Sequence, residues 1–193
     1  TNAKKQAIRE SRVKSTELLA RTLAGMERPP QALICASAIG FYGDRGDEVL
    51  TEASAAGTGF FPGGGVAWGQ AADACREKLR VVHLRLGIVL SPKGGALASM
   101  LLPFRLGGGG IIGDGKQYWS WITLDDAAKA FLFAAEHPTL AGPANTVAPH
   151  PVTNKEFTKA LGQVLHRPTL IPMPAAAARL ALGEMADGLI LSS

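Results

Sequence analysis

Apolar side chains recur at helical spacing over the first residues of the chain. They form one face from residue 3 to residue 25, and the pattern ends at Gly25, shortly before Pro29 and Pro30. Glycine at the end of such a pattern and proline beyond it are helix stop signals. The pattern therefore predicts one long helix with a defined end.

Two short apolar runs follow, Ala32 to Ala38 and Val81 to Leu90. Their composition is typical of strands that are buried on both faces. A polar loop, Gly43 to Gly59, and a helical pattern from about Val66 to Leu79 lie between them. A strand, a crossover helix and a second strand together predict a parallel α/β sheet.

The second half of the chain predicts shorter elements. Thr153 and Glu156 have the spacing of a capping box and predict a helix that runs to about His166. The other elements are helices at 96–104, 125–137 and 175–193, and extended pieces at 119–124 and around 145–148. Because both ends of the chain fall inside helical patterns, we expect it to be trimmed from a larger domain.

Composition excludes several classes of protein. With 193 residues, 47% of them hydrophobic and 19% charged, the chain can bury a core and is neither disordered nor collagen-like. No run approaches the ~20 apolar residues of a membrane span, and no signal peptide follows the first residues, so we expect no membrane partner. Cys35 and Cys75 belong to no C-x-x-C motif. A reducing compartment is expected, either the cytoplasm or an organelle stroma or matrix.

The net charge of +4 raises the question of a nucleic-acid partner. Residues 1–30 hold seven basic and three acidic residues, and the remaining 13 basic and 13 acidic residues cancel. The basic segment has no aromatic residue on which a base could stack. We therefore interpret it as the solvated face of one helix and expect no nucleic-acid partner.

Glycine patterns in the chain only superficially match phosphate-binding loops. Gly108-x-Gly110-x-x-Gly113 matches G-x-G-x-x-G, but no helix is predicted after it to offer an amide cradle. The pattern Gly40-x-x-Gly43-x-x-Gly46 follows a strand, yet the acidic residues within and after it would repel a pyrophosphate. The run at 63–65 lacks G-K-[ST] and predicts a turn before a helix. The four histidines are isolated and no G-x-S-x-G occurs, so neither a metal site nor a serine hydrolase is expected.

Ser37 and Tyr42 stand at the end of the first predicted strand. Ligands of open parallel sheets bind outside the carboxyl ends of the strands, so a hydroxyl and a phenol are well placed there for catalysis. In the alternative interpretation, Ser37 caps the strand and Tyr42 packs in the loop. The sequence leaves both open.

Several motifs resemble, in order and spacing, the extended short-chain dehydrogenase/reductase group. They are SAIGFYGD from Ser37, LRLGIVL from Leu84, GDGKQ from Gly113 and WITLDD from Trp121. The longer strings SAIGFYGDRGDEVLTE, GGALASMLLPFRLGGGG, GDGKQYWSWITLDDAAKA and NTVAPHPVTNKEF resemble more narrowly its atypical, NAD(P)-dependent epimerase-like subfamily.

This resemblance implies an α/β fold with a partial, Rossmann-like parallel sheet and a small carboxyl-terminal α+β substrate domain. Residues 1–92 would be the second half of the NAD(P)-binding domain, and residues 93–193 would complete the sheet and form the small domain. The family's first strand and glycine-rich loop are absent from the chain. The resemblance therefore implies NADP or NAD in the full-length protein and weak or no binding by this chain alone. A homo-oligomer is compatible with it.

The resemblance also implies roles for individual residues. Ser37 would orient a substrate oxygen and Tyr42 would be a polar catalytic group. The cofactor would meet Ala36, Ser37, Leu86 and Gly87, and the pocket for a small-molecule substrate would include Gln117, Trp119 and Asn145. Alternatives stay open for these three: a surface role for Gln117, a core role for Trp119 and a turn role for Asn145.

Two departures from the family bear on the chemistry. No Tyr-x-x-x-Lys occurs, because Gly46 follows Tyr42 and Ile122 follows Tyr118 at that spacing. Trp119 stands where nucleotide-sugar members have an arginine for the diphosphate. We therefore expect an NAD(P)-binding oxidoreductase or epimerase-like protein of unidentified substrate, or alternatively a non-catalytic nucleotide-sensing regulator or scaffold on a Rossmann shell.

Overall fold

The computed structural model describes residues 2–183 and 185–193. Two compact units, each assembled from several segments, make up the structure. Unit 1 comprises the chain as far as Tyr42 together with Leu50–Leu86 and Ala128–Thr146; unit 2 comprises Gly43–Val49, Gly87–Ala127 and Val147–Ser193. The boundary between two domains that the sequence predicts after residue 92 stays a prediction.

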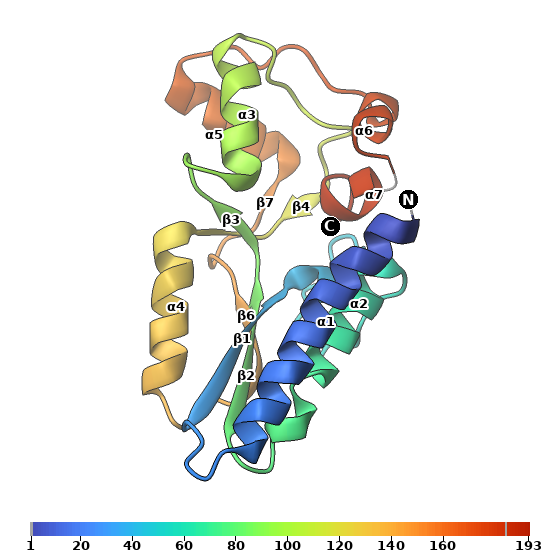
Figure 1. Ribbon diagram of the computed structural model, residues 1–193. Coiled ribbons are helices and arrows are strands. Elements are labelled where there is room, and N and C mark those ends of the chain that lie inside the picture. The colour runs from blue at the N-terminus through green and yellow to red at the C-terminus, as the bar shows by residue number, and fades with distance from the viewer. Residues whose placement is uncertain (1, 184) are drawn as a thin grey trace. The chain divides into compact units, whose positions relative to one another are not determined.

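Unit 1 is built on a parallel three-stranded sheet in the order β1-β2-β6, which confirms the predicted α/β fold. Its strands are β1 (Ala32–Ala38), β2 (Arg80–Leu86) and β6 (Gly142–Thr146). Helices α1 (Asn2–Gly25) and α2 (Phe60–Gln70) lie on one side of the sheet, and α4 (Leu124–Glu136) lies on the other (Figure 1).

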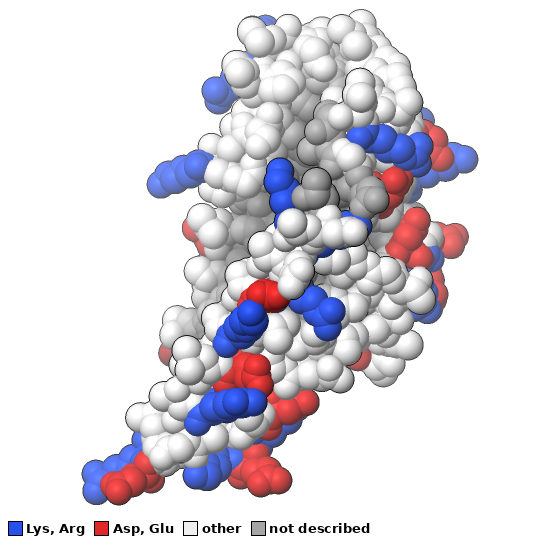
Figure 2. Space-filling view, turned by 45° about the vertical axis from the view of Figure 1, so that its right-hand side comes forward, with Lys and Arg blue, Asp and Glu red and all other residues white. Residues whose placement is uncertain are grey.

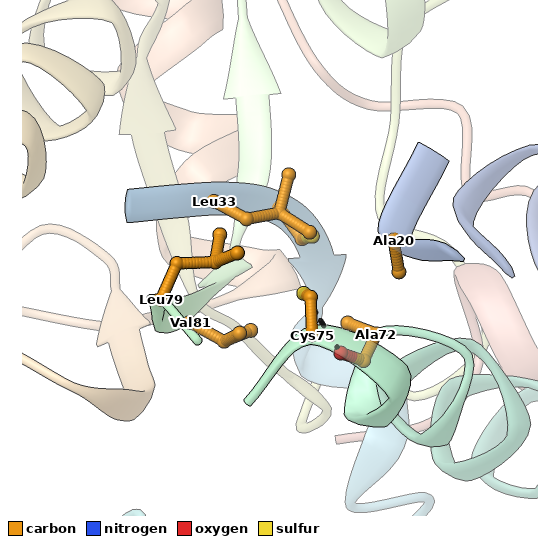
Figure 3. Packing of buried hydrophobic residues seen from close by; sticks show 7 residues of the cluster. Ala20, Leu33, Ala72, Cys75, Leu79 and Val81 are labelled. Carbon is orange, nitrogen blue, oxygen red and sulfur yellow. Dashed lines mark hydrogen bonds between the residues drawn. The ribbon is translucent and has the colours of Figure 1, made fainter. Parts of the chain in front are cut away.

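Both faces of this sheet are buried, as the apolar runs predict. On the α1 side, Leu33, Cys35 and Val81 pack with Ala20 and Cys75 (Figure 3). On the opposite face, a second cluster is formed by Val82, Leu84 and Ala134. Burying one valine or leucine side chain of these clusters stabilises the fold by roughly 1.5–3 kcal/mol.

Arg80 joins the amino end of β2 to the end of α4. Its Nη1 donates to the carbonyl oxygens of Ala134 and Leu140 at 2.9 and 2.7 Å. These contacts place a cation at the carboxyl end of the helix, where carbonyls lack helical partners and the helix dipole is negative.

The helix predicted from Val66 to Leu79 is wrong at both ends. Helix α2 begins at Phe60 and ends at Gln70, and only a short 3-10 turn, η2 (Asp73–Cys75), follows. The run at 63–65 lies inside α2, so the predicted turn is also wrong. Glycine is a poor helix former, but Gly65 brings α2 close to Phe41: an added Cβ would lie 3.4 Å from the Phe41 Cα.

The strand predicted from Val81 to Leu90 is interrupted at Gly87. It divides into β2 and β3 (Ile88–Leu90), and the Ile88 amide donates to the Ser120 carbonyl at 2.8 Å. A Cβ at Gly87 would lie 2.6 Å from the same carbonyl oxygen. This close backbone approach therefore requires glycine at the break.

Unit 2 combines short strand pairs with helices. Strand β3 pairs in parallel with β5 (Trp121–Thr123), and β4 (Tyr118–Trp119) pairs antiparallel with β7 (Val152–Thr153). The helices are α3 (Gly95–Arg105), α5 (Asn154–Leu165), α6 (Ala175–Leu182) and α7 (Met185–Leu189). The last helical pattern is thus not one helix, because α6 ends before Gly183.

The predicted capping box of α5 is confirmed. Thr153 Oγ1 accepts the Glu156 amide at 3.2 Å, and the Glu156 carboxylate accepts the Thr153 amide at 2.7 Å. The helix ends at Leu165, and the capping residue His166 has a left-handed φ of 52°. No helix in the described residues is both long and apolar enough to span a membrane.

Candidate functional site

Three polar residues occupy one level at the carboxyl ends of the unit 1 strands. Ser37 of β1 is in register with Arg85 of β2, which is in register with Asn145 of β6. Adjacent strands lie ~4.8 Å apart, so the register brings these residues together. This edge of an open α/β sheet is where ligands bind.

Tyr42 completes the group from the turn that follows β1. The 3-10 turn η1 (Ile39–Phe41) leads to Tyr42, whose side chain is 4% exposed. Its hydroxyl accepts a hydrogen bond from Arg85 Nη1 at 2.6 Å and donates one to Asn145 Oδ1 at 2.6 Å. The phenol therefore joins β1, β2 and β6 instead of pointing freely into solvent.

Arg85 is a site residue that sequence reasoning did not single out. It is 8% exposed, and its guanidinium carbon lies 3.7 Å from the centre of the Phe41 ring. Stacking of this kind holds the plane of the guanidinium fixed. One feature of the sequence could have pointed to Arg85: it is the single charged residue within the apolar run LRLGIVL. Arginine is rarely fully buried unless its charge is paired.

Glu52 was also missed. From the loop after β1, its carboxylate accepts the Asn145 amide at 2.7 Å, while its main-chain oxygen lies 3.4 Å from Arg85 Nη1. The Asn145 hydrogen bond is the main reason that the pKa of Glu52 lies below its usual value, and the charge of Arg85 adds to this. The loop is thereby tied across the end of the sheet.

The residues expected beside the cofactor occupy different surroundings. Ala36 is half-buried on β1 opposite Leu84, and Leu86 packs with the α4-side cluster. Gly87 makes the close approach to Ser120 described above. Their role toward a cofactor stays a prediction.

Gln117 and Trp119 lie in unit 2, whereas Ser37, Tyr42 and Asn145 lie in unit 1. Gln117 is 7% exposed and donates from Nε2 to the carbonyls of Ile112 and Ile190. Trp119 is 3% exposed, and its ring centre lies 5.1 Å from that of Phe157. Both side chains are therefore packed within unit 2, which does not support the surface alternative for Gln117.

Three further titratable side chains of unit 1 are buried: His83, Cys35 and Cys75. Burial and the neighbouring Arg76, whose Nη2 lies 3.4 Å from His83 Nε2, lower the pKa of His83. Burial raises the pKa of the thiols of Cys35 and Cys75. Across the described chain, no three His, Cys, Asp or Glu side chains cluster as metal ligands would.

Comparison with known proteins identifies relatives along almost the whole chain. No family model matches it. An epimerase family protein of Mycobacterium bovis, Mb2239, is 44% identical over 193 residues, which cover 99% of this chain and 64% of that protein. The chain thus spans less than two thirds of the length of this relative.

Solved structures show the same relationship. The human epimerase family protein SDR39U1 (isoform 2), solved with NADPH, superposes with a TM-score of 0.92 at 34% identity, over 98% of this chain and 65% of that one. A nucleoside-diphosphate sugar epimerase from Corynebacterium glutamicum gives a TM-score of 0.76 at 39% identity, over 94% of this chain and 40% of that one. The chain is therefore similar over almost its whole length to epimerase-like short-chain dehydrogenases/reductases, the family that its motifs resemble.

Proposed function

We propose that the protein containing this chain binds NADP or NAD and acts on a small molecule as an oxidoreductase or epimerase-like enzyme. The observation that carries this proposal is the polar group of Ser37, Arg85 and Asn145 at the ligand-binding edge of a parallel sheet. The NADPH of the human relative supports the choice of cofactor.

Ser37 is suited to orient a substrate oxygen. Its hydroxyl forms no hydrogen bond with another described residue, and its strand-end position leaves the oxygen free to donate to a ligand. A bound nicotinamide would supply hydride transfer. Tyr42 positions Arg85 and Asn145, because its hydroxyl is already engaged with both.

A second candidate function, a nucleotide-sensing regulator or scaffold, is favoured by one specific observation. The chain has no Tyr-x-x-x-Lys, and the two described hydrogen-bond partners of the Tyr42 phenol, Arg85 and Asn145, include no lysine. Acid–base catalysis of hydride transfer in this superfamily uses a tyrosine whose proton is exchanged with the substrate. Turnover of cofactor with a broad panel of carbonyl compounds separates an enzyme from a sensor.

The proposed substrate is not a nucleotide sugar, although the Corynebacterium relative is described as an epimerase of such compounds. By the resemblance of its motifs, Trp119 stands where nucleotide-sugar members have an arginine for the diphosphate. Losing one charge-assisted hydrogen bond costs roughly 1.5–3 kcal/mol. Efficient turnover of a UDP-sugar by the full-length protein would contradict this.

We further propose a cytoplasmic, stromal or matrix protein without a nucleic-acid partner. On the face in Figure 2, basic and acidic side chains are interspersed. Within α1, Lys14 pairs with Glu10 and Arg21 pairs with Glu17. Interspersed charges of both signs do not form the continuous basic surface that nucleic acids require.

Calorimetric titration of NADPH and NADH tests the proposal. We expect the full-length protein to bind one of them at micromolar concentration, about −8 kcal/mol, and the 193-residue chain alone to bind weakly or not at all. The chain lacks the glycine loop and helix amino terminus that hold a pyrophosphate. Absence of binding to the full-length protein overturns the cofactor proposal, and micromolar binding to the chain alone overturns its weak-binding part.

A further inference from the structure

Arg85 carries a buried charge with an unused hydrogen-bonding edge. The residue is 8% exposed, and only its Nη1 donates to a described residue. Nε and Nη2, which together form the side-on fork of the guanidinium, donate to none. Among the described residues, the unpartnered side-chain atoms that are sealed from solvent are Trp119 Nε1 and Asn154 Nδ2, so neither atom of the Arg85 fork is one of them. The fork is therefore available to a ligand.

No described carboxylate forms an ion pair with Arg85 within 4.0 Å. Glu52 gives its carboxylate to the Asn145 amide and offers Arg85 only a main-chain oxygen. Burying a cation is expensive unless its donors are satisfied and its charge is balanced. The Phe41 and Tyr42 rings hold the guanidinium in place without neutralising it.

Ser37 provides a second donor beside this fork. Side chains that are in register on neighbouring parallel strands point to the same face, ~5 Å apart. Ser37 and Arg85 are such a pair, and neither the Ser37 hydroxyl nor the Arg85 fork has a described partner. A two-pronged cation and a hydroxyl thus stand together at the carboxyl edge of the sheet.

We propose that this pair recognises a small carboxylic acid with a carbonyl or hydroxyl oxygen next to its carboxylate. The side-on fork matches the two oxygens of a carboxylate, and the Ser37 hydroxyl donates to the adjacent oxygen. This inference rests on the proposed function, because it names the substrate class of the same strand-end site. It assigns ligand binding to Arg85, which lies in the motif LRLGIVL but for which the resemblance implies no role.

The test observes the arginine fork directly in the full-length protein. Arginine Nε–H resonances are recorded by NMR during titration with pyruvate, with its neutral amide and with inorganic phosphate. The Arg85 signal is identified by its disappearance in Arg85→Lys. We expect a saturable shift of that signal with pyruvate and none with the amide.

Variants separate recognition from folding. Arg85→Lys replaces the fork by a point charge and is expected to weaken pyruvate binding at least tenfold, and Ser37→Ala is expected to weaken it severalfold. Arg179→Lys is the matched control, because Arg179 is exposed and pairs with Asp187; its pyruvate affinity should equal that of the parent. If Arg85→Lys fails to fold, the Arg85 signal is assigned in the wild-type protein by triple-resonance NMR, and the wild-type titration and Ser37→Ala still decide the matter.

Three results would overturn the proposal. The first is a shift of the Arg85 signal with phosphate alone, which would assign the fork to a phosphate group. The second is an equal shift with pyruvate and with its amide, and the third is no shift with any of the three probes. NADPH and NADH are titrated into the same samples. Binding of either one without a carboxylate response overturns this inference alone, whereas carboxylate binding without binding of NADPH or NADH overturns the cofactor proposal alone.

Discussion

At the scale of single residues, the buried strand β2 carries two side chains that could be charged, His83 and Arg85, on the face that also bears Val81. Alternation along a strand places all three on one side of the sheet. The apolar end lies deep between the helices, while Arg85 stands at the ligand-binding edge. The sequence shows this order but not the contacts, because Tyr42, which accepts from Arg85, and Asn145, which accepts from Tyr42, are distant from β2 in the chain.

Acidification is expected to destabilise the protein through His83. Burial and then Arg76 lower its folded-state pKa, with a smaller contribution from Arg85 opposed by Asp73; the unfolded value stays near ~6.5. As the pH falls below about 6.5, His83 takes up a proton in the unfolded chain while it is still neutral in the folded chain. The free energy of unfolding therefore falls as the pH drops, by at most ~1.4 kcal/mol per pH unit.

Urea denaturation between pH 7.5 and 5.5 measures this effect. His83→Gln should flatten the pH dependence in that window. An identical slope in the variant would show that other groups cause it.

Replacement of Trp119 by arginine is expected to destabilise unit 2. The indole is 3% exposed against Phe157, so Trp119→Arg removes packing and places a charge in the core. A loss of roughly 3–5 kcal/mol follows from comparable removals of large core side chains. Tyr118→Arg is the matched control, because the neighbouring Tyr118 is 41% exposed.

Thermal melting and ligand affinity are measured together for both variants. We expect Trp119→Arg to melt at a clearly lower temperature and Tyr118→Arg to melt close to the parent. An unchanged melting temperature with altered ligand affinity would instead place Trp119 in a ligand pocket.

At the scale of elements, sequence patterns predicted the features that depend on interactions between residues close together in the chain. The capping box placed the start of α5 because the hydrogen bonds of Thr153 and Glu156 are made within one turn. The apolar run at 32–38 gave β1 for the same reason, since every residue in it suits a buried strand. Helix α2 could not be placed in this way, because tertiary packing on η1 overrides the low helix propensity of its glycines.

An alanine in α2 is expected to stabilise the protein. Gly63 is exposed within the helix, and a Cβ there would meet no atom within 4 Å. Gly63→Ala should therefore raise the free energy of unfolding by roughly 0.5–1 kcal/mol, because alanine loses less backbone entropy in a helix.

Denaturant melts check this, with Gly65→Ala as the comparison. A Cβ at Gly65 would lie 3.4 Å from the Phe41 Cα, so that variant should gain less or lose stability. Equal gains at both positions would contradict the packing argument.

At the scale of the whole molecule, the sequence predicted the parallel sheet and its family but not the interleaving of the two units. Unit 2 takes Gly43–Val49 from between two segments of unit 1, which depends on contacts between distant residues. Three residues singled out from the sequence, Ser37, Tyr42 and Asn145, lie at one edge of the sheet, and their roles stay predictions. Arg85 and Glu52 were not foreseen, because their significance lies in burial and partners.

The 193-residue chain on its own is expected to be unstable or to self-associate. In the described sheet β1 pairs with β2 alone, which leaves the backbone groups of its other edge without a strand partner. Such an edge can pair with another chain. Leu132 and Phe133 of α4 are also more than half exposed, at 58% and 52%.

Sedimentation velocity over a range of concentrations measures the self-association. We expect an average mass that rises with concentration for the chain alone and a defined species for the full-length protein. A monodisperse monomer of the chain with a sharp cooperative melt would contradict the prediction.

The run of three glycines at 63–65 inside α2, which also contains Gly69, bears on how the molecule moves. Each costs roughly 1 kcal/mol of helix stability relative to alanine, so α2 can open locally while α4 stays closed. In amide hydrogen exchange, α2 should exchange about 10²-fold faster than α4, and equal protection would contradict this. Since α2 contacts β1 on the face that bears Ser37 and Arg85, brief local opening would let small solutes reach that face without global unfolding.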